Sequence, residues 1–203
     1  MKRREFLMAV PVAAVGLARE AAAAANRGAA AASAEIAETK LVSAAEPGQQ
    51  LVVSGTIYGP DGVTPARGVR LFLYHTDTQG YYSQPRDNSR EARIRGWVPA
   101  DEQGRYRFRT IQPAHYATGA RPPAHIHTHL YGPDMPAHWM DSFLFADDRY
   151  LTAEQVSESR KLGEFSPIMQ GNARGGVLYC ARDIRLNPGV YERNRLVNGW
   201  YRN

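Results

Sequence analysis

Short runs of β-prone residues separated by turn signals make up most of this chain, and they limit the folds it can adopt. In the run GVRLFLYHT (68–76), Val69, Leu71 and Leu73 fall on one side, because the side chains of a strand alternate between its two faces. The run GRYRFRTI (104–111) places aromatic side chains on one face and arginines on the other, as in a strand with one buried and one solvated face. This pattern predicts an all-β fold, an antiparallel β-sandwich.

Further elements complete the expected sandwich. The runs interpreted as strands are LVVSGTIYG (51–59), AHIHTHLYG (124–132), DSFLFADD (141–148) and GGVLYCARDIRL (175–186). The residues GPDG (59–62) predict a turn after the first of them. One short helix is expected after Thr152, because Thr152 and Gln155 form a capping-box pattern and Gly163 can end a helix. The segments between these elements predict long loops.

The first 48 residues are expected to serve export and to stay outside the sandwich. The opening MKRREFLMAVPVAAVGLA has a basic start, a short apolar stretch and then small residues, which is the layout of a signal peptide. RREFL (3–7) resembles the twin-arginine export motif, so residues 1–25 are interpreted as a twin-arginine-type signal peptide. Residues 26–48, rich in Ala, Ser and Glu, are interpreted as a flexible tether, and residues 49–203 as one domain.

This interpretation makes the twin-arginine export machinery a partner of the chain and places the mature protein in the periplasm or outside the cell. No apolar run reaches the ~20 residues that a membrane-spanning helix needs, so no stable membrane anchor is expected after signal removal. The twin-arginine route carries folded proteins, which suits a protein that is loaded with a cofactor before export.

The composition argues against nucleic acid as a partner. The formal net charge is +5, but the basic residues are scattered among acidic ones, which is typical of a mixed solvated surface. Hydrophobic residues make up 43% of the chain and charged residues 22%, as in ordinary globular proteins. Cys180 is the one cysteine, so no internal disulfide can form. Its apolar surroundings predict a small buried side chain.

A histidine pair is the sharpest local signal for chemistry. His125 and His127 occupy positions i and i+2 of an expected strand, so both point the same way, about 6.6 Å apart along the chain. Neutral imidazole suits iron, zinc or copper. His129 extends the same face but would have to reach across roughly 13 Å, so a packing or supporting role is expected for it. His75 and His138 are interpreted as loop or surface histidines.

Several motifs surround this pair in a fixed order. They are SGTIYGPDG (54–62), YHTDTQGYY (74–82), RGW (95–97), DEQGRYRFRTIQPAHY (101–116) and RPPAHIH (121–127). In these motifs the chain resembles the intradiol ring-cleavage dioxygenases, the family of protocatechuate 3,4-dioxygenase and catechol 1,2-dioxygenase. The resemblance covers roughly residues 49 to 186, and the motifs together are far more specific than any one of them.

The resemblance implies a fold, a cofactor and an activity. The fold would be the prealbumin-like β-sandwich of these enzymes, and the metal a non-haem ferric iron held by Tyr82, Tyr116, His125 and His127. A phenolate is a hard anionic donor and favours ferric iron. The partners would be a small catechol-type molecule and dioxygen, and the ring would be cleaved between its two hydroxylated carbons to a muconate-type diacid. Tyr116 would also be catalytic by taking a substrate proton, and an oligomer is possible.

The chain departs from the family pattern in the expected substrate pocket. The family arginine near the substrate lies three residues before the first histidine, where this chain has Pro122, so the catalytic role falls on Arg121. A position that is often Gln in the family is Ser142 here, and a strand-ending Trp is Tyr74. We expect iron binding to survive these changes better than substrate identity. The segment before Gln49 is too short to match the helical dimerisation segment of the catechol 1,2 type, which favours the protocatechuate-type core.

Two other readings stay open. The chain could be an exported transthyretin-like binding module for carbohydrate or protein, with a vestigial metal site. It could also be a zinc hydrolase that uses His125, His127 and His129. Retention of all four ligand positions argues against the first, and tyrosine is a poor zinc ligand. Colour separates the three, because a ferric-tyrosinate protein absorbs visible light.

Overall fold

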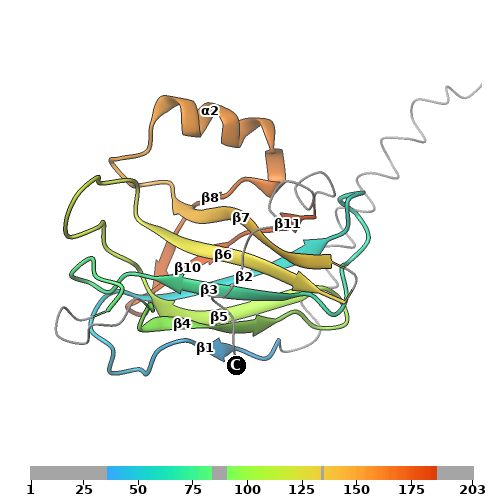
Figure 1. Ribbon diagram of the computed structural model, residues 1–203, viewed down its shortest axis with the longest axis horizontal. Coiled ribbons are helices and arrows are strands. Elements are labelled where there is room, and N and C mark those ends of the chain that lie inside the picture. The colour runs from blue at the N-terminus through green and yellow to red at the C-terminus, as the bar shows by residue number, and fades with distance from the viewer. Residues whose placement is uncertain (1–35, 84–90, 134, 187–203) are drawn as a thin grey trace, which may run out of the picture. The chain divides into compact units, whose positions relative to one another are not determined.

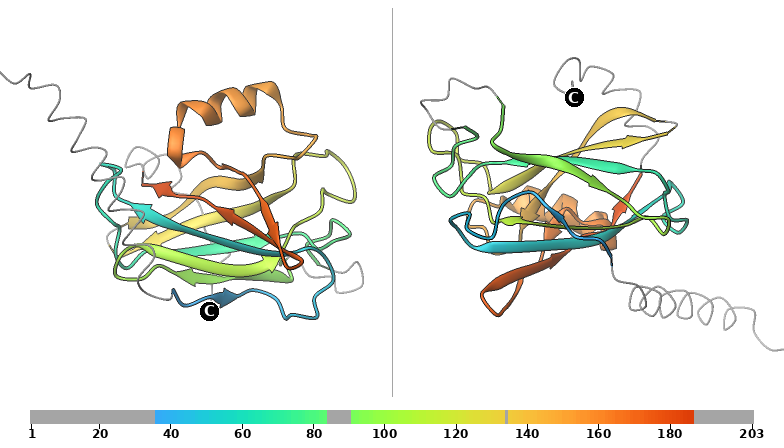
Figure 2. Two further views of the ribbon diagram at one scale, coloured as in Figure 1. Left: turned by 180° about the vertical axis from the view of Figure 1, so that it is seen from behind. Right: turned by 90° about the horizontal axis from the view of Figure 1, so that it is seen from below.

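The computed structural model describes residues 36–83, 91–133 and 135–186, which form two β-sheets that lie face to face (Figures 1 and 2). The expected signal peptide and the first part of the expected tether lie outside the described residues. Within the described part of the chain, no helix is both long and apolar enough to cross a membrane.

One sheet has six strands in the order β1-β5-β2-β10-β9, with β11 also paired to β2. The strands are β1 (Thr39–Lys40), β2 (Gln50–Tyr58), β5 (Arg105–Ile111), β9 (Asn172–Arg174), β10 (Val177–Ala181) and β11 (Ile184–Arg185). β2 pairs with β5 antiparallel, with Val53 opposite Phe108. β10 and β11 run parallel to β2, and β1 runs parallel to β5.

The other sheet has five strands in the order β4-β3-β6-β7-β8. The strands are β3 (Arg70–His75), β4 (Ile94–Pro99), β6 (His125–Gly132), β7 (Met135–Phe145) and β8 (Ile168–Met169). β6 lies in the middle, antiparallel to both β3 and β7, and a bulge interrupts its register with β7 between Ile126 and Thr128. The histidine pair is therefore held by a central strand of this sheet.

The predicted sandwich is confirmed, and its sheets are mixed where purely antiparallel ones were expected. Parallel pairing needs a long connection between the two strands. The chain supplies one, because β10 returns to β2 from 127 positions further along.

The core between the sheets is formed by the apolar residues that alternate with polar ones along the predicted strands. The side chains of Leu71, Leu73, Tyr106 and Phe108 have no exposed surface. Each large side chain buried in this way contributes about 1.5–3 kcal/mol to stability. The core cluster consists of Leu51, Val53, Ile57, Val69, Leu71, Leu73, Val98, Tyr106, Phe108, Ala124, Ile126, Leu130, Phe143, Phe145, Met169, Cys180, Ile184 and Leu186. Cys180 is buried, as expected.

The predicted helix is α2 (Ala153–Lys161), and it lies along the β7 and β8 side of the five-stranded sheet (Figure 1). Thr152 is its N-cap, and both hydrogen bonds of the capping box with Gln155 are present. A short 3₁₀ helix, η1 (Gly163–Phe165), follows, with Gly163 at φ +58°. The sequence therefore located both ends of this helix.

The expectation of a structureless tether is wrong for residues 36–48. Thr39 and Lys40 form β1 on the edge of the six-stranded sheet. The Glu38 carboxylate accepts hydrogen bonds from Arg107 at 3.0 Å and from Arg109 at 2.7 Å. Arg107 and Arg109 were expected to face solvent, but they bind the Glu38 carboxylate. This contact holds residues 36–48 on the six-stranded sheet.

Candidate metal centre

Strand β6 places two imidazoles on the outer face of the five-stranded sheet. Ile126 and Thr128 point into the core and have no exposed surface. Because side chains alternate along a strand, His125 and His127 point the other way. Their Nε2 atoms lie 3.1 Å apart, so the two rings converge instead of lying side by side. The spacing predicted from the sequence therefore brings the pair to one point.

Two tyrosines reach the same point from loops. Tyr82 follows β3 and Tyr116 follows β5, and their hydroxyl oxygens lie 2.7 Å apart. Tyr116 Oη is 3.0 Å from His125 Nε2 and 3.3 Å from His127 Nε2. Tyr82 Oη is 2.8 Å from His127 Nε2. Four donor atoms from three separate segments thus face one another at a single point.

The protonation of His125 suits a metal ligand. Its Nδ1 lies 2.7 Å from the carbonyl oxygen of Pro123. A carbonyl only accepts, so Nδ1 carries the proton and Nε2 of the neutral ring presents a lone pair to the centre. This backbone contact also fixes the orientation of the ring, as is usual for metal-binding histidines.

Burial disfavours the charged forms of Tyr82 and His127 when no cation balances them. Burial raises the pKa of the Tyr82 phenol well above its usual range, and its hydrogen bond with Tyr116 adds to the effect. Burial also lowers the pKa of His127 to about 3, helped by the neighbouring His125. A multiply charged cation reverses this preference for Tyr82 by favouring its phenolate.

The donor set fits a ferric ion. Two phenol oxygens supply hard donors, two imidazoles complete the set, and a four-residue set leaves coordination positions for substrate. Among the described residues, no group of three or more His, Cys, Asp or Glu could hold a metal ion. A metal site at this point therefore depends on Tyr82 and Tyr116.

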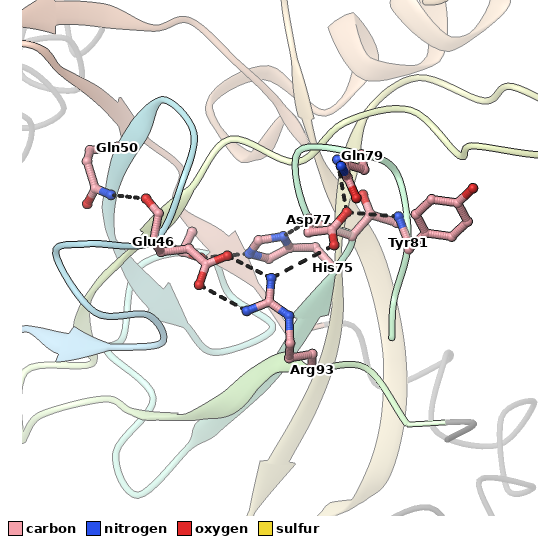
Figure 3. A network of polar contacts seen from close by, with 9 residues as sticks. Glu46, Gln50, His75, Asp77, Gln79, Tyr81 and Arg93 are labelled. Atoms are coloured by element: carbon pink, nitrogen blue, oxygen red, sulfur yellow. Dashed lines mark hydrogen bonds and ion pairs between the residues drawn. The ribbon is translucent and has the colours of Figure 1, made fainter. Parts of the chain in front are cut away.

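A polar network around Asp77 and Arg93 shapes the turn that ends at Tyr81, next to Tyr82 in the chain (Figure 3). Asp77 Oδ1 accepts hydrogen bonds from the backbone N–H groups of Gln79 and Tyr81 at 2.9 and 3.1 Å. Arg93 lies 3.9 Å from the Asp77 carboxylate and makes a two-pronged contact with Glu46. The N–H of Arg93 also donates to the carbonyl of Tyr82. Segment 36–48 therefore contributes to the support of the site through Glu46.

Gly80 allows the two tyrosine-bearing loops to touch. Its φ is +83°, a conformation that side chains rarely adopt. A Cβ at this position would lie 2.1 Å from the carbonyl oxygen of His115 and 2.6 Å from the nitrogen of Ala117. The N–H of Ala117 donates to the carbonyl of Gly80 at 3.2 Å. Only glycine fits a contact this close between backbones.

A cleft of about 380 Å³ opens beside His125. Its walls come from the segment before β6, from β7 and from helix α2. The lining residues are Pro122, Pro123, His125, Asp141, Ser142, Leu144, Gln155, Glu158, Ser159, Leu162 and Pro167. The volume lies in the range typical of small-molecule sites. Pro122 and Ser142, two of the positions where this chain departs from the family pattern, both line it.

Three other residues were singled out in the sequence, and the structure places Arg121 and His129 outside the donor set and Tyr74 against a donor ring. Arg121 is exposed and is not among the residues that line the cleft. Its hydrogen bond with the Tyr150 hydroxyl lowers the pKa of Tyr150. His129 is buried, with its ring centroid 3.7 Å from that of Trp139, so it packs as expected. Tyr74 stacks on the ring of His127 at 4.6 Å.

The interpretation of His75 as a loop or surface histidine is wrong. It ends β3 with no exposed surface. Its Nδ1 donates to the carbonyl of Thr76, and its Nε2 accepts from the Thr110 hydroxyl, both at 2.7 Å. Because both nitrogens are satisfied, a neutral ring can be buried, and burial lowers its pKa to about 4. His138 lies in β7, which corrects the loop assignment for its backbone.

Sequence reasoning missed the acidic residues that support the site. Asp148 accepts a hydrogen bond from His115 Nε2 and another from the backbone nitrogen of Ala124. Glu46 contacts Arg93 from within the expected tether. Their partners lie far away in the sequence, so spacing gives no signal for them.

Comparison with known proteins agrees with this fold. A family model described as "Dioxygenase" matches residues 25–173, most of the chain. The chain therefore belongs to this dioxygenase family, a family of intradiol ring-cleaving oxidoreductases.

Curated relatives match parts of the chain. A catechol 1,2-dioxygenase from Acinetobacter baylyi is 31% identical over 114 residues, which are 54% of this chain and 36% of that protein. A hydroxyquinol 1,2-dioxygenase from a Rhizobium species is 30% identical over 117 residues, covering 44% of this chain and 39% of that protein. The chain thus spans less than half the length of these two relatives.

Solved structures share the fold. The dioxygenase domain of a dioxygenase carbohydrate-binding protein fusion from a Streptomyces species superposes with a TM-score of 0.57 at 23% identity, over 76% of this chain and 91% of that one. Catechol 1,2-dioxygenase from Pseudomonas arvilla gives a TM-score of 0.59 at 22% identity, over 79% and 62% of the two chains. An intradiol ring-cleavage dioxygenase from Tetranychus urticae gives 0.57 at 18% identity, over 77% and 89%.

Proposed function

We propose that this chain holds one ferric ion with Tyr82, Tyr116, His125 and His127 and cleaves a catechol-type ring between its two hydroxylated carbons with dioxygen. The observation that carries the proposal is the convergence of four donor atoms, with neighbouring contacts of 2.7 to 3.3 Å. The names of the relatives support the same chemistry.

The side chains have separate tasks in this proposal. When bound, ferric iron supplies a Lewis acid that prepares the ring for reaction with dioxygen. Tyr116 Oη accepts a proton from one of the catechol hydroxyls. The contact of His125 Nδ1 with the Pro123 carbonyl holds that imidazole in place. The cleft beside His125 receives the ring, with Leu144 and Leu162 as apolar walls.

The lining of the cleft favours a ring without an anionic substituent. The carboxylates of Asp141 and Glu158 line it, and no Lys or Arg is among its described lining residues. Glu158 is ion-paired with Lys161, which leaves Asp141 as the main charge facing a substituent. A ring carboxylate would thus meet like charge and no Lys or Arg among the described lining residues. We expect catechol to be a better substrate than protocatechuate.

The decisive test is the colour of the iron-loaded protein. We expect a visible charge-transfer band in the wild type, and we expect Tyr116→Phe and His125→Ala each to remove it. Tyr179→Phe, a change in β10 of the other sheet, is the control and should keep the band. A band that survives both ligand changes would refute the assignment.

Activity is tested with an oxygen electrode and no external reductant. The panel contains catechol, protocatechuate, hydroxyquinol and substituted catechols. Oxygen uptake with at least one of them is expected. A colourless protein that takes up zinc would favour the hydrolase reading, and a protein that consumes no oxygen with any catechol would favour the binding module.

We also propose export by the twin-arginine route, on the strength of RREFL (3–7) alone. Replacing Arg3 and Arg4 together with Lys should keep the folded protein inside the cell, as measured by cell fractionation. Unchanged export of that variant would refute this route.

A further inference from the structure

Asp148 lies just after β7 and is outside the donor set, yet its side chain is only 3% exposed. Its Oδ2 accepts two hydrogen bonds. One comes from His115 Nε2 at 2.9 Å and the other from the backbone nitrogen of Ala124 at 2.7 Å. Its Oδ1 accepts from the backbone nitrogen of Tyr150 at 2.8 Å. The buried carboxylate is therefore fully engaged, and each oxygen has a different task.

The two partners of Oδ2 are the chain neighbours of two expected iron ligands. His115 precedes Tyr116, and Ala124 precedes His125. In sequence these partners lie 33 and 24 positions from Asp148, on separate segments. One oxygen atom thus ties the loop that carries Tyr116 to the start of the strand that carries His125. The distance of 3.0 Å between Tyr116 Oη and His125 Nε2 depends on the relative position of these two segments.

We propose that Asp148 is a positioning residue that sets the separation of Tyr116 and His125 and thereby the affinity of the centre for ferric iron. The proposal rests on the assignment of these two residues as iron ligands. Hydrogen bonds that orient metal ligands typically change metal affinity by about 10- to 100-fold when they are lost. Asp148 is well placed for this role, because a charged acceptor makes stronger hydrogen bonds than a neutral one.

The role can be separated from general stability, because Oδ1 and Oδ2 act on different parts of the chain. Asp148→Asn can keep the Oδ1 contact with Tyr150, which shapes the local turn. Its amide NH₂ would replace Oδ2, and an NH₂ group cannot accept from His115 or Ala124. The turn is then retained, while the bond from the Ala124 nitrogen and the charge-assisted bond from His115 are lost.

The experiment compares Asp148→Asn with Asp147→Asn, an equal change at an exposed neighbouring carboxylate. Ferric-iron affinity is measured by competition with a chelator, the visible band by absorption, and the fold by thermal unfolding of the iron-free proteins. We expect Asp148→Asn to bind iron about 10- to 100-fold more weakly, with a shifted band. Asp147→Asn should match the wild type. Equal iron affinity and an identical band in both variants would overturn the proposal.

A second measurement does not depend on iron. A crystal structure of iron-free Asp148→Asn should show Tyr116 Oη and His125 Nε2 further apart than in the wild type. An unchanged separation would refute the positioning role even if the chain never binds iron. If the separation grows while the wild type binds no iron, the positioning stands and the proposed function fails.

Chemical rescue gives a third readout, for the case that loss of the carboxylate harms folding. Asp148 and His115 line a cleft of about 340 Å³, which has room for a small anion. In Asp148→Ala, added formate should restore part of the iron affinity, because it returns an acceptor to His115 and Ala124. Formate should have no effect on Asp147→Ala. Rescue that is equal in both variants, or absent from Asp148→Ala, would count against the proposal.

Discussion

Gly80 makes the approach of the two tyrosine-bearing loops possible. It combines a φ of +83° with backbone atoms of His115 and Ala117 where a Cβ would be. The first property costs any other residue about 1–2 kcal/mol. The second cannot be relieved by moving a side chain, because the atoms it meets are backbone.

Gly80→Ala should therefore remove the visible band of the iron-loaded protein, because the loops must separate to admit the methyl group. The control is Gly176→Ala, which has a similar φ of +77° but nothing within 4 Å of its Cβ. The control should lose stability without losing the band. Bands of equal strength in the two variants would show that the loop contact does not matter for the metal.

The placement of single residues could be predicted from the sequence where it follows from their position within a strand. His125 and His127 were found because positions i and i+2 of a strand share a face. The same rule could have placed His75, since Leu71, Leu73 and His75 share the inner face of β3. Its burial was missed because the acceptors and donors that satisfy it, at Thr76 and Thr110, are visible only in the fold.

Helix α2 connects a local sequence signal to the expected substrate site. Thr152 and Gln155 cap its first turn, and Gln155, Glu158 and Ser159 face the cleft beside His125. The position of one wall of the cleft therefore depends on this helix.

Thr152→Ala removes the N-cap hydroxyl, which costs about 1 kcal/mol of stability. We expect a lower thermal midpoint and a higher KM for the best catechol of the panel, with an unchanged visible band. Thr152→Ser keeps a hydroxyl and should behave like the wild type. A changed band in Thr152→Ala would mean that the helix also positions the iron ligands.

Helices and strands with a clear pattern in their own residues, such as the capping box of α2, could be predicted from the sequence. The two-residue strand β1, which depends on a distant partner, could not. Thr39–Lys40 has only two residues and follows an Ala-rich segment, so its pairing with β5 left no trace in the sequence. The run that contains β10 and β11 was predicted as a strand, but its parallel pairing with β2 was not, because pairing direction is decided by where a later strand returns.

Two carboxylates of the segment before β2, Glu38 and Glu46, are paired with arginines of the rest of the domain. Burial alone would raise the pKa of Glu38, but hydrogen bonds from Arg109 and Arg107 outweigh it and lower the pKa below its usual value. The pKa of Glu46 is lowered mainly by its hydrogen bonds with Arg93. A group whose pKa is lower in the folded state adds stability above its unfolded pKa, and this stability is lost as pH falls through the folded pKa.

Acid should therefore destabilise the protein once the pH falls below about 4.5, the ordinary pKa of a glutamate. Glu38→Gln should lower the free energy of unfolding at pH 7 by roughly 1 kcal/mol, because partly exposed pairs contribute little. Its stability should also fall less steeply with acid, as measured by urea unfolding at several pH values. Glu102→Gln, at an exposed site in a turn, is the control. Identical pH profiles for Glu38→Gln and the wild type would contradict this account.

The parallel pairing of β10 with β2 affects how the protein is made. Partners across these strands lie 127 positions apart, so a ribosome delivers β2 long before β10. Until then one edge of β2 has no neighbour, and an open strand edge invites association with other chains. The nascent chain thus has an interval in which a chaperone would protect it, and that interval closes only when β10 (Val177–Ala181) has been synthesised.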